Sequence, residues 1–298
     1  MFFNSVQAGT ESMNTYLSFA ARGRNDWWRY LLSPMLACLL AGVGMVIPVT
    51  VLMLMHQLPP DIAQQMQQPK NFVPFYLGIG VAFGFLAAGL AAAAAMIHGK
   101  RPADPIGSWS WRLFVKGFCI WMGVQTVLSL IDYLIAPDGF ALSVGRGTIV
   151  LAATAFAGIL VQIFAEEYIF RGYVTQGLLL AFKRTWPAAI ASGLLFGSVH
   201  IPNGVPQAIN ATVFGIVCAF IAIRTGGIAL TCGLHLANNY FGAAIVVSGS
   251  DVFRGSPGLV SQTTPHLVWW DLLLAIAVLG GMLWWVARSS YFVVPADS

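Results

Sequence analysis

The sequence predicts an all-α integral membrane protein, a polytopic bundle of about eight transmembrane helices with a buried polar site. Of the 298 residues, 58% are hydrophobic and 9% are charged, whereas a soluble domain carries about 25% charged residues. The apolar runs are too long for barrel strands, so helices are the structures that can satisfy the backbone within the hydrocarbon. A small set of polar residues interrupts these runs and locates the site.

Eight apolar segments divide the chain, and most reach the length of about 20 residues that a spanning helix needs. The fifth is short and need not cross the membrane fully, and residues 172–186 predict a short interfacial helix between the fourth and the fifth. Because no low-complexity linker interrupts the series, residues 1–298 are predicted to form one domain, with a motif-bearing core at about 148–248. The segments are 31–55, 73–98, 112–135, 148–170, 186–200, 206–223, 227–248 and 267–287.

Basic residues gather on alternate loops. They precede the first segment, separate the second from the third, and follow the fourth, sixth and eighth. By the positive-inside rule, this pattern predicts an even number of crossings with both termini in the cytoplasm. Topology therefore accounts for the basic pI near 9.0, and no motif of a nucleic-acid-binding fold is present. The partner that composition predicts is the lipid bilayer, and no oligomeric state is predicted.

Two adjacent glutamates, Glu166 and Glu167, end the fourth segment of a chain that has only three glutamates. A charged side chain at the bilayer centre costs about 2.5 kcal/mol or more on insertion scales, so this pair predicts a buried functional site. Arg171 follows Glu167 by four residues and lies on the same helical face as an ion-pair partner. Glu166 points about 100° away, which leaves its carboxylate free to act.

Three more polar groups follow in the same half of the chain. His200 lies four residues after Phe196, and His235 and Asn239 share one helix face because they are also four residues apart. Counting about 1.5 Å of rise per residue places Glu166 and His235 in the cytoplasmic half of the membrane. His200 is expected nearer the midplane. We expect these groups to meet in one cavity that opens to the cytoplasm.

This set of side chains favours hydrolysis. A carboxylate and a histidine beside one water molecule can position it and take its proton. A second histidine and an asparagine amide can donate hydrogen bonds to the oxyanion of a tetrahedral intermediate. No serine or cysteine adjoins a histidine in a known nucleophile arrangement, so a covalent mechanism is disfavoured.

The stretches EEYIFR, FGSVH and HLANN match the motifs EExxxR, FxxxH and HxxxN. Together and in this order, they resemble the family of CAAX prenyl protease type II and bacteriocin-processing proteins, called the CPBP or Abi intramembrane proteases. The resemblance covers about residues 150–245, and the first 145 residues match only in being apolar and multi-spanning.

The resemblance implies an intramembrane endopeptidase of eight helices in a bacterial inner (plasma) membrane. Its substrate would be a membrane-associated peptide or protein, such as a prenylated CAAX protein, and the site would be reached from the cytoplasm. In this reading Glu166 and His200 activate water, and His235 and Asn239 stabilise the oxyanion. The supporting residues are Glu167, Arg171 and Phe196.

No cofactor is expected, and a divalent metal such as zinc is the alternative. Glu166, His200 and His235 can supply the two histidines and one glutamate of a catalytic zinc site. The chain has no HExxH motif, however, and Asn239 is a poor zinc ligand. Metal-independent glutamate chemistry is therefore favoured.

Two other classes of function fit parts of the pattern. The family also includes non-catalytic members, so a bacteriocin-immunity or partner-binding factor is one alternative. The other is a proton-coupled transporter, because intramembrane carboxylates and histidines also build proton relays. A relay needs a polar path through both membrane halves, and the outer halves of these helices are apolar. Asp132 and Asp271 lie near segment ends and are expected to face the interface.

Overall fold

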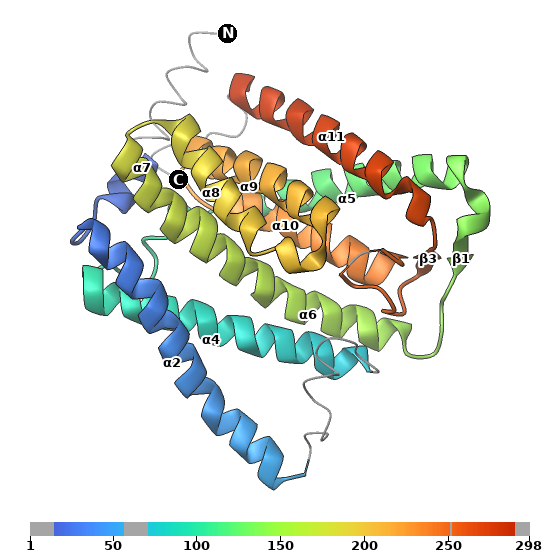
Figure 1. Ribbon diagram of the computed structural model, residues 1–298, viewed down its shortest axis with the longest axis horizontal. Coiled ribbons are helices and arrows are strands. Elements are labelled where there is room, and N and C mark those ends of the chain that lie inside the picture. Colours follow the sequence, from blue (N-terminus) through green and yellow to red (C-terminus); the bar gives the residue numbers. More distant parts are fainter. Residues whose placement is uncertain (1–14, 57–70, 251, 290–298) are drawn as a thin grey trace.

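The computed structural model describes residues 15–56, 71–250 and 252–289 as a bundle of helices (Figure 1), which confirms the all-α prediction. Each of the eight predicted apolar segments corresponds to a helix. The ends of the predicted domain, 1–14 and 290–298, lie outside the described residues. The helices are α2 (Trp27–Leu54), α4 (Phe72–His98), α5 (Trp111–Ile135), α6 (Thr148–Glu167), α7 (Thr175–Phe182), α8 (Thr185–Ser198), α9 (Val205–Thr225), α10 (Ala229–Tyr240) and α11 (Val268–Arg288).

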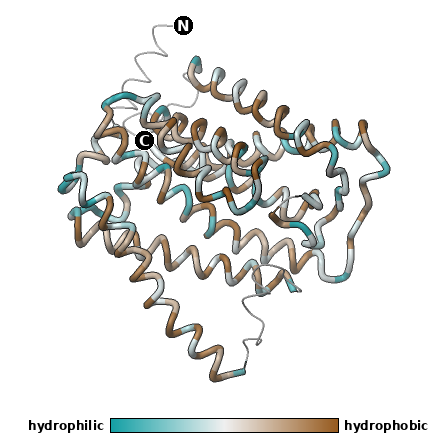
Figure 2. Tube along the Cα trace, in the orientation of Figure 1, coloured by the Kyte–Doolittle hydropathy of each residue, from teal (hydrophilic) through white to brown (hydrophobic). Residues whose placement is uncertain are grey.

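The protein is an integral, multi-pass membrane protein. Within the described residues, six helical spans are long and apolar enough to cross a membrane, and α8 and α10, with 14 and 12 residues, fall below that length. The prediction of eight crossings is therefore approximate. Hydrophobic residues cover the long helices, and hydrophilic residues gather at helix ends and loops (Figure 2). Leu39, Ile47 and Leu54 of α2 are 62%, 72% and 76% exposed, as expected for side chains that face lipid.

The fourth segment runs without a break from α6 into α7. A π-helix, η2 (Tyr168–Val174), joins the two, and α7 ends at Phe182, where the capping residue Lys183 has a φ of 52°. The separate interfacial helix predicted over 172–186 is therefore wrong, because most of that stretch continues the spanning helix. π-helical turns occur frequently at functional sites, and this one begins directly after Glu167.

A small three-stranded sheet lies at the other end of α6, and the sequence analysis did not predict it. β1 (Phe140–Leu142) pairs antiparallel with β3 (Val260–Gln262), and β2 (Val246–Ser248) pairs with β3 in parallel. The seventh segment, predicted to be helical to residue 248, ends instead in the π-helix η4 (Phe241–Ile245). Residues 246–248 extend because β3, which lies 14 residues further along the chain, supplies their backbone partners.

Close packing between α4 and α6 holds the glutamate-bearing helix in place. The helices follow one another as neighbours, α2 on α4, α4 on α6, α6 on α10 and α10 on α5, while α9 packs against α8 and α11 (Figure 1). A Cβ atom on Gly80 of α4 would lie 3.0 Å from the Cα of Gly158. A Cβ atom on Gly158 would overlap the carbonyl group of Tyr76. Small residues at such a crossing let two backbones approach closely.

We predict that Gly158→Ala lowers the free energy of unfolding by about 1–3 kcal/mol, because an overpacked methyl group forces α6 away from α4. Thermal unfolding of the purified protein in detergent would measure this. Gly78→Ala in α4 is the matched control, since nothing lies within 4 Å of its Cβ position. Equal midpoints for the two variants would contradict the close crossing.

Candidate functional site

Glu166 and Glu167 lie at the end of α6 against His235, in the middle of α10. Although neighbouring residues of a helix point about 100° apart, both carboxylates reach this one imidazole. His235 Nδ1 is 2.8 Å from Glu167 Oε1, and His235 Nε2 is 3.6 Å from Glu166 Oε2. All three side chains are buried. The ring therefore bridges the two carboxylates, and Glu166 is not turned away from the paired residues as the helical geometry alone suggested.

Glu167 also forms the ion pair that its spacing from Arg171 predicts. Arg171 Nη1 lies 3.2 Å from Glu167 Oε1, and both side chains are 0% exposed. The guanidinium group stacks over the ring of Phe196 in α8, with its central carbon 4.0 Å from the ring centroid. A desolvated cation–π contact of this kind adds attraction to the ion pair. Three elements, α6 with η2, α8 and α10, thus close around one pair of charges.

Glu166 is held differently. Its Oε1 accepts a hydrogen bond of 3.0 Å from Gln162 Nε2, one helical turn earlier. Its Oε2 is buried and accepts no hydrogen bond from the described residues, and 3.6 Å is too long for a direct hydrogen bond to His235. Oε2 is therefore the oxygen that can bind a reacting group. The sequence analysis missed Gln162, although its spacing of four residues from Glu166 was the signal for this contact.

His200 reaches the site through Phe196. At the end of α8, its Nδ1 is 2.7 Å from the carbonyl oxygen of Phe196, and its ring lies 4.5 Å from the Phe196 ring. The same phenyl ring contacts His235 edge to face at 5.8 Å. Phe196 thus touches both histidines, and the histidine that adjoins Glu166 is His235.

Asn239 lies one turn beyond His235 on α10 and is half-buried. Its Oδ1 accepts a hydrogen bond of 3.1 Å from Asn238 Nδ2, and Asn238 Oδ1 accepts one of 3.1 Å from Trp121 Nε1. Asn238 lies one residue before Asn239 on α10. Its amide orients the amide of Asn239, which leaves the Nδ2 group of Asn239 as a donor.

Tyr16 approaches the site from the N-terminal segment, and no sequence pattern pointed to it. Its buried hydroxyl group donates a hydrogen bond to the main-chain carbonyl of Arg171, 155 residues away. Lys100 Nζ also contacts this segment. It donates hydrogen bonds of 2.6 and 2.9 Å to the main-chain carbonyl groups of Ala20 and Arg22. Burial lowers the pKa of Lys100 to about 8. This end of the bundle is the one where the basic loops gather.

The alternative zinc set does not assemble. Among the described residues, no three His, Cys, Asp or Glu side chains are grouped so that they can hold a metal ion. Glu166 and His235 adjoin, but the contacts of His200 are with Phe196. These residues do not fit a zinc site, and the side chains themselves are the groups available for proton transfer.

Comparison with known proteins agrees with the motifs. Residues 148–241 match the family described as type II CAAX prenyl endopeptidase Rce1-like. The match makes this segment similar to the CAAX-type intramembrane proteases and confirms the resemblance that the motifs indicated. The matched residues include Glu166, Glu167, Arg171, His200, His235 and Asn239.

A relative along most of the chain has no described activity. The uncharacterized protein YyaK of Bacillus subtilis (strain 168) is 27% identical over 298 residues, which cover 93% of this chain and 98% of that protein. No solved structure matches the chain.

We predict that Arg171→Ala lowers the free energy of unfolding by about 3–5 kcal/mol, because it leaves the buried carboxylate of Glu167 without its partner. Thermal unfolding in detergent would measure the loss. Arg184→Ala, which removes an exposed arginine just after α7, should leave the midpoint unchanged. Equal stability of the two variants would show that the Glu167–Arg171 pair does not support the fold.

Proposed function

We propose that the protein is an intramembrane endopeptidase in which Glu166 activates water to hydrolyse a peptide bond. The observation that carries this proposal is the pair of atoms Glu166 Oε2 and His235 Nε2, which lie 3.6 Å apart. The oxygen is buried and has no donor among the described residues. Polar atoms at this separation suit a bridging water, and such a water adjoins both a carboxylate and an imidazole that can take its proton.

The contacts of His235 support this assignment. When Nδ1–H donates to Glu167, the neutral ring carries its lone pair on Nε2, the nitrogen that faces Glu166. Glu167 would then fix the orientation and tautomer of the imidazole, as the aspartate of a catalytic triad does. Arg171 would balance the charge of Glu167. The histidine that assists Glu166 is thus His235 in our proposal, whereas the family resemblance implied His200.

Two further residues, Asn239 and His200, are proposed to act on the peptide bond of the substrate. Asn239 Oδ1 accepts from Asn238, so its Nδ2 is the donor that we propose for the oxyanion. His200 Nδ1 is engaged by the Phe196 carbonyl, which leaves Nε2 to exchange a proton with the leaving amine. In this scheme water attacks the carbonyl carbon and gives one proton to Glu166, and that same proton is delivered to the leaving nitrogen, by Glu166 or by way of His200 Nε2, as the C–N bond breaks.

The expected substrate is a membrane-associated peptide or protein, with a prenylated CAAX-type segment as its most specific form. The site lies toward the end of the bundle where Lys100 and Arg22 meet the N-terminal segment. With the positive-inside rule, this supports access from the cytoplasm. The relative in Bacillus subtilis supports a bacterial plasma membrane as the location.

We predict that Glu166→Gln lowers the cleavage rate by about 10²–10⁴-fold, the usual contribution of a general base. The fold should be preserved, because the glutamine amide can still accept the hydrogen bond from Gln162. Protein termini would be compared in membranes of the native host that carry equal amounts of wild type and variant. Termini that appear with wild type and disappear with the variant would identify the substrate.

Asp138→Asn, which changes an exposed carboxylate, is the control and should give the wild-type termini. Equal cleavage by Glu166→Gln and wild type would exclude Glu166 as the base. Identical termini together with an intact biological phenotype would favour the non-catalytic alternative, and proton-dependent flux in proteoliposomes without proteolysis would favour the transporter.

We also propose that the reaction needs no zinc, and predict that cleavage of the identified substrate is unchanged by 1,10-phenanthroline, which binds zinc strongly and calcium weakly. Zinc sites of the catalytic kind depend on three protein ligands, and the three candidate side chains are not grouped. The rate would be measured before and after dialysis against the chelator. A loss of activity that added zinc restores would contradict a purely glutamate-based mechanism.

A further inference from the structure

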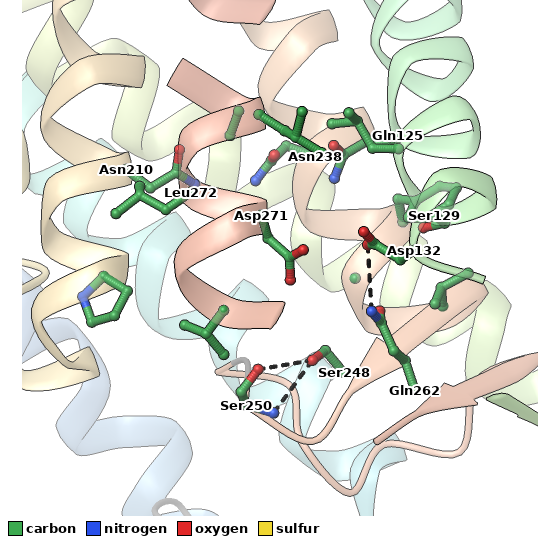
Figure 3. Close-up of a pocket in the computed structure, with 18 of the residues that line it drawn as sticks. Gln125, Ser129, Asp132, Asn210, Asn238, Ser248, Ser250, Gln262, Asp271 and Leu272 are labelled. Atoms are coloured by element: carbon green, nitrogen blue, oxygen red, sulfur yellow. Dashed lines mark hydrogen bonds between the residues drawn. The ribbon is translucent and has the colours of Figure 1, made fainter. Parts of the chain in front are cut away.

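A second polar site lies at the end of the bundle that carries the sheet. Residues of α5, α9 and α11, with η4 and the sheet strands β2 and β3, line a cavity of about 230 Å³ (Figure 3). Asp132 and Asp271 both line it, so their carboxylates face a cavity near the ends of their helices. The outer half of the bundle is therefore more polar than the sequence suggested.

One face of α5 supplies much of the polar lining. Gln125, Ser129 and Asp132 follow one another at spacings of four and three residues, so they form a row on the same helical face. Asp271, in the first turn of α11, lies opposite. Figure 3 shows both carboxylates pointing into the space between the two helices, with Gln262 of β3 below Asp132.

The two aspartates have no cationic partner in the cavity. Asp132 is only 7% exposed, and the described residues that line the cavity include no lysine, arginine or histidine. Asp132 Oδ2 accepts a long hydrogen bond of 3.4 Å from Gln262, while Oδ1 of Asp132 and Oδ1 of Asp271 are buried and accept no N–H or hydroxyl hydrogen bond from the described residues. A buried carboxylate must be paired, bound to a metal or neutralised by a proton, and no basic side chain among the described lining residues pairs with these two.

We propose that this cavity binds a hard divalent cation of the Ca²⁺ or Mg²⁺ class between Asp132 and Asp271. Two carboxylates balance the double charge. The neutral donors beside them, the hydroxyl of Ser129 and the amide of Gln125, are also oxygen ligands of the kind that these ions select. The lining has neither the thiolates nor the imidazoles that would favour zinc or copper. At about 30 Å³ per water molecule, the remaining volume can hold the waters that complete the coordination shell.

A cation in this position would connect elements that are far apart in sequence. It would join the last turns of α5 to the first turn of α11, next to the sheet strand that carries Gln262. The cavity also borders Asn238, whose amide donates to Asn239 of the candidate site. The proposal concerns binding alone and does not depend on the proposed protease activity.

The test is binding of Ca²⁺ and Mg²⁺ to the full-length protein in detergent after removal of metal with EDTA. Isothermal titration calorimetry would give stoichiometry and affinity, and thermal unfolding would give a second readout. We expect saturable binding of about one ion per chain and a rise in the unfolding midpoint, since a ligand that binds only the folded state stabilises it. Asp132→Asn and Asp271→Asn should each weaken binding at least tenfold.

Two control variants separate this site from others. Asp138→Asn removes an exposed carboxylate at the same end of the bundle, and Glu166→Gln changes the candidate catalytic site. Both should bind the ion as wild type does. If an aspartate variant fails to fold, Ser129→Ala, which removes one neutral ligand, should still weaken binding. Absence of saturable binding to folded wild type, or equal binding by all of these variants, would overturn the proposal.

Discussion

The ion pair between Glu167 and Arg171 is the interaction on which the rest of the site depends. Two opposite charges within a membrane bundle cost desolvation energy that their attraction offsets only when other groups complete the contacts. Here His235 binds the carboxylate, and Phe196 covers the guanidinium group. Each of these groups comes from a different helix. Satisfying one pair of charges therefore fixes how α6, α8 and α10 meet.

The same contacts separate the two glutamates in chemical terms. Glu167 is neutralised and held by two partners, and it acts on the site by orienting His235. Glu166 keeps one oxygen bound to Gln162 and the other without a protein donor. Glu166 and Glu167 thus differ in their hydrogen-bond and charge partners, although they are adjacent and have the same side chain. The π-helix that begins after Glu167 and the glycine crossing of α4 with α6 hold the pair at the depth where His235 lies.

The buried acidic residues have different charge partners at the two ends of the bundle. Near the basic loops, Glu167 has an arginine within the protein, and the N-terminal segment closes over the site through Tyr16. Near the sheet, Asp132 and Asp271 face each other across a cavity with no basic side chain among its described lining residues. A protein can balance a buried charge internally or leave it to a ligand. Glu167 has its cation within the protein, whereas Asp132 and Asp271 have no basic side chain among the described lining residues and would take a bound cation in our proposal.

The membrane environment, the helical segments and the motif residues can be read from the amino-acid sequence, because they follow from local composition and from spacings of three or four residues. The pairing of Glu167 with Arg171 is of this local kind. The strand at residues 246–248 is visible only in the folded chain. The same is true of two contacts, that of Glu166 with His235 rather than His200 and that of Tyr16 with Arg171. Those contacts join segments far apart in the chain, and their geometry depends on how helices pack, which no local pattern encodes.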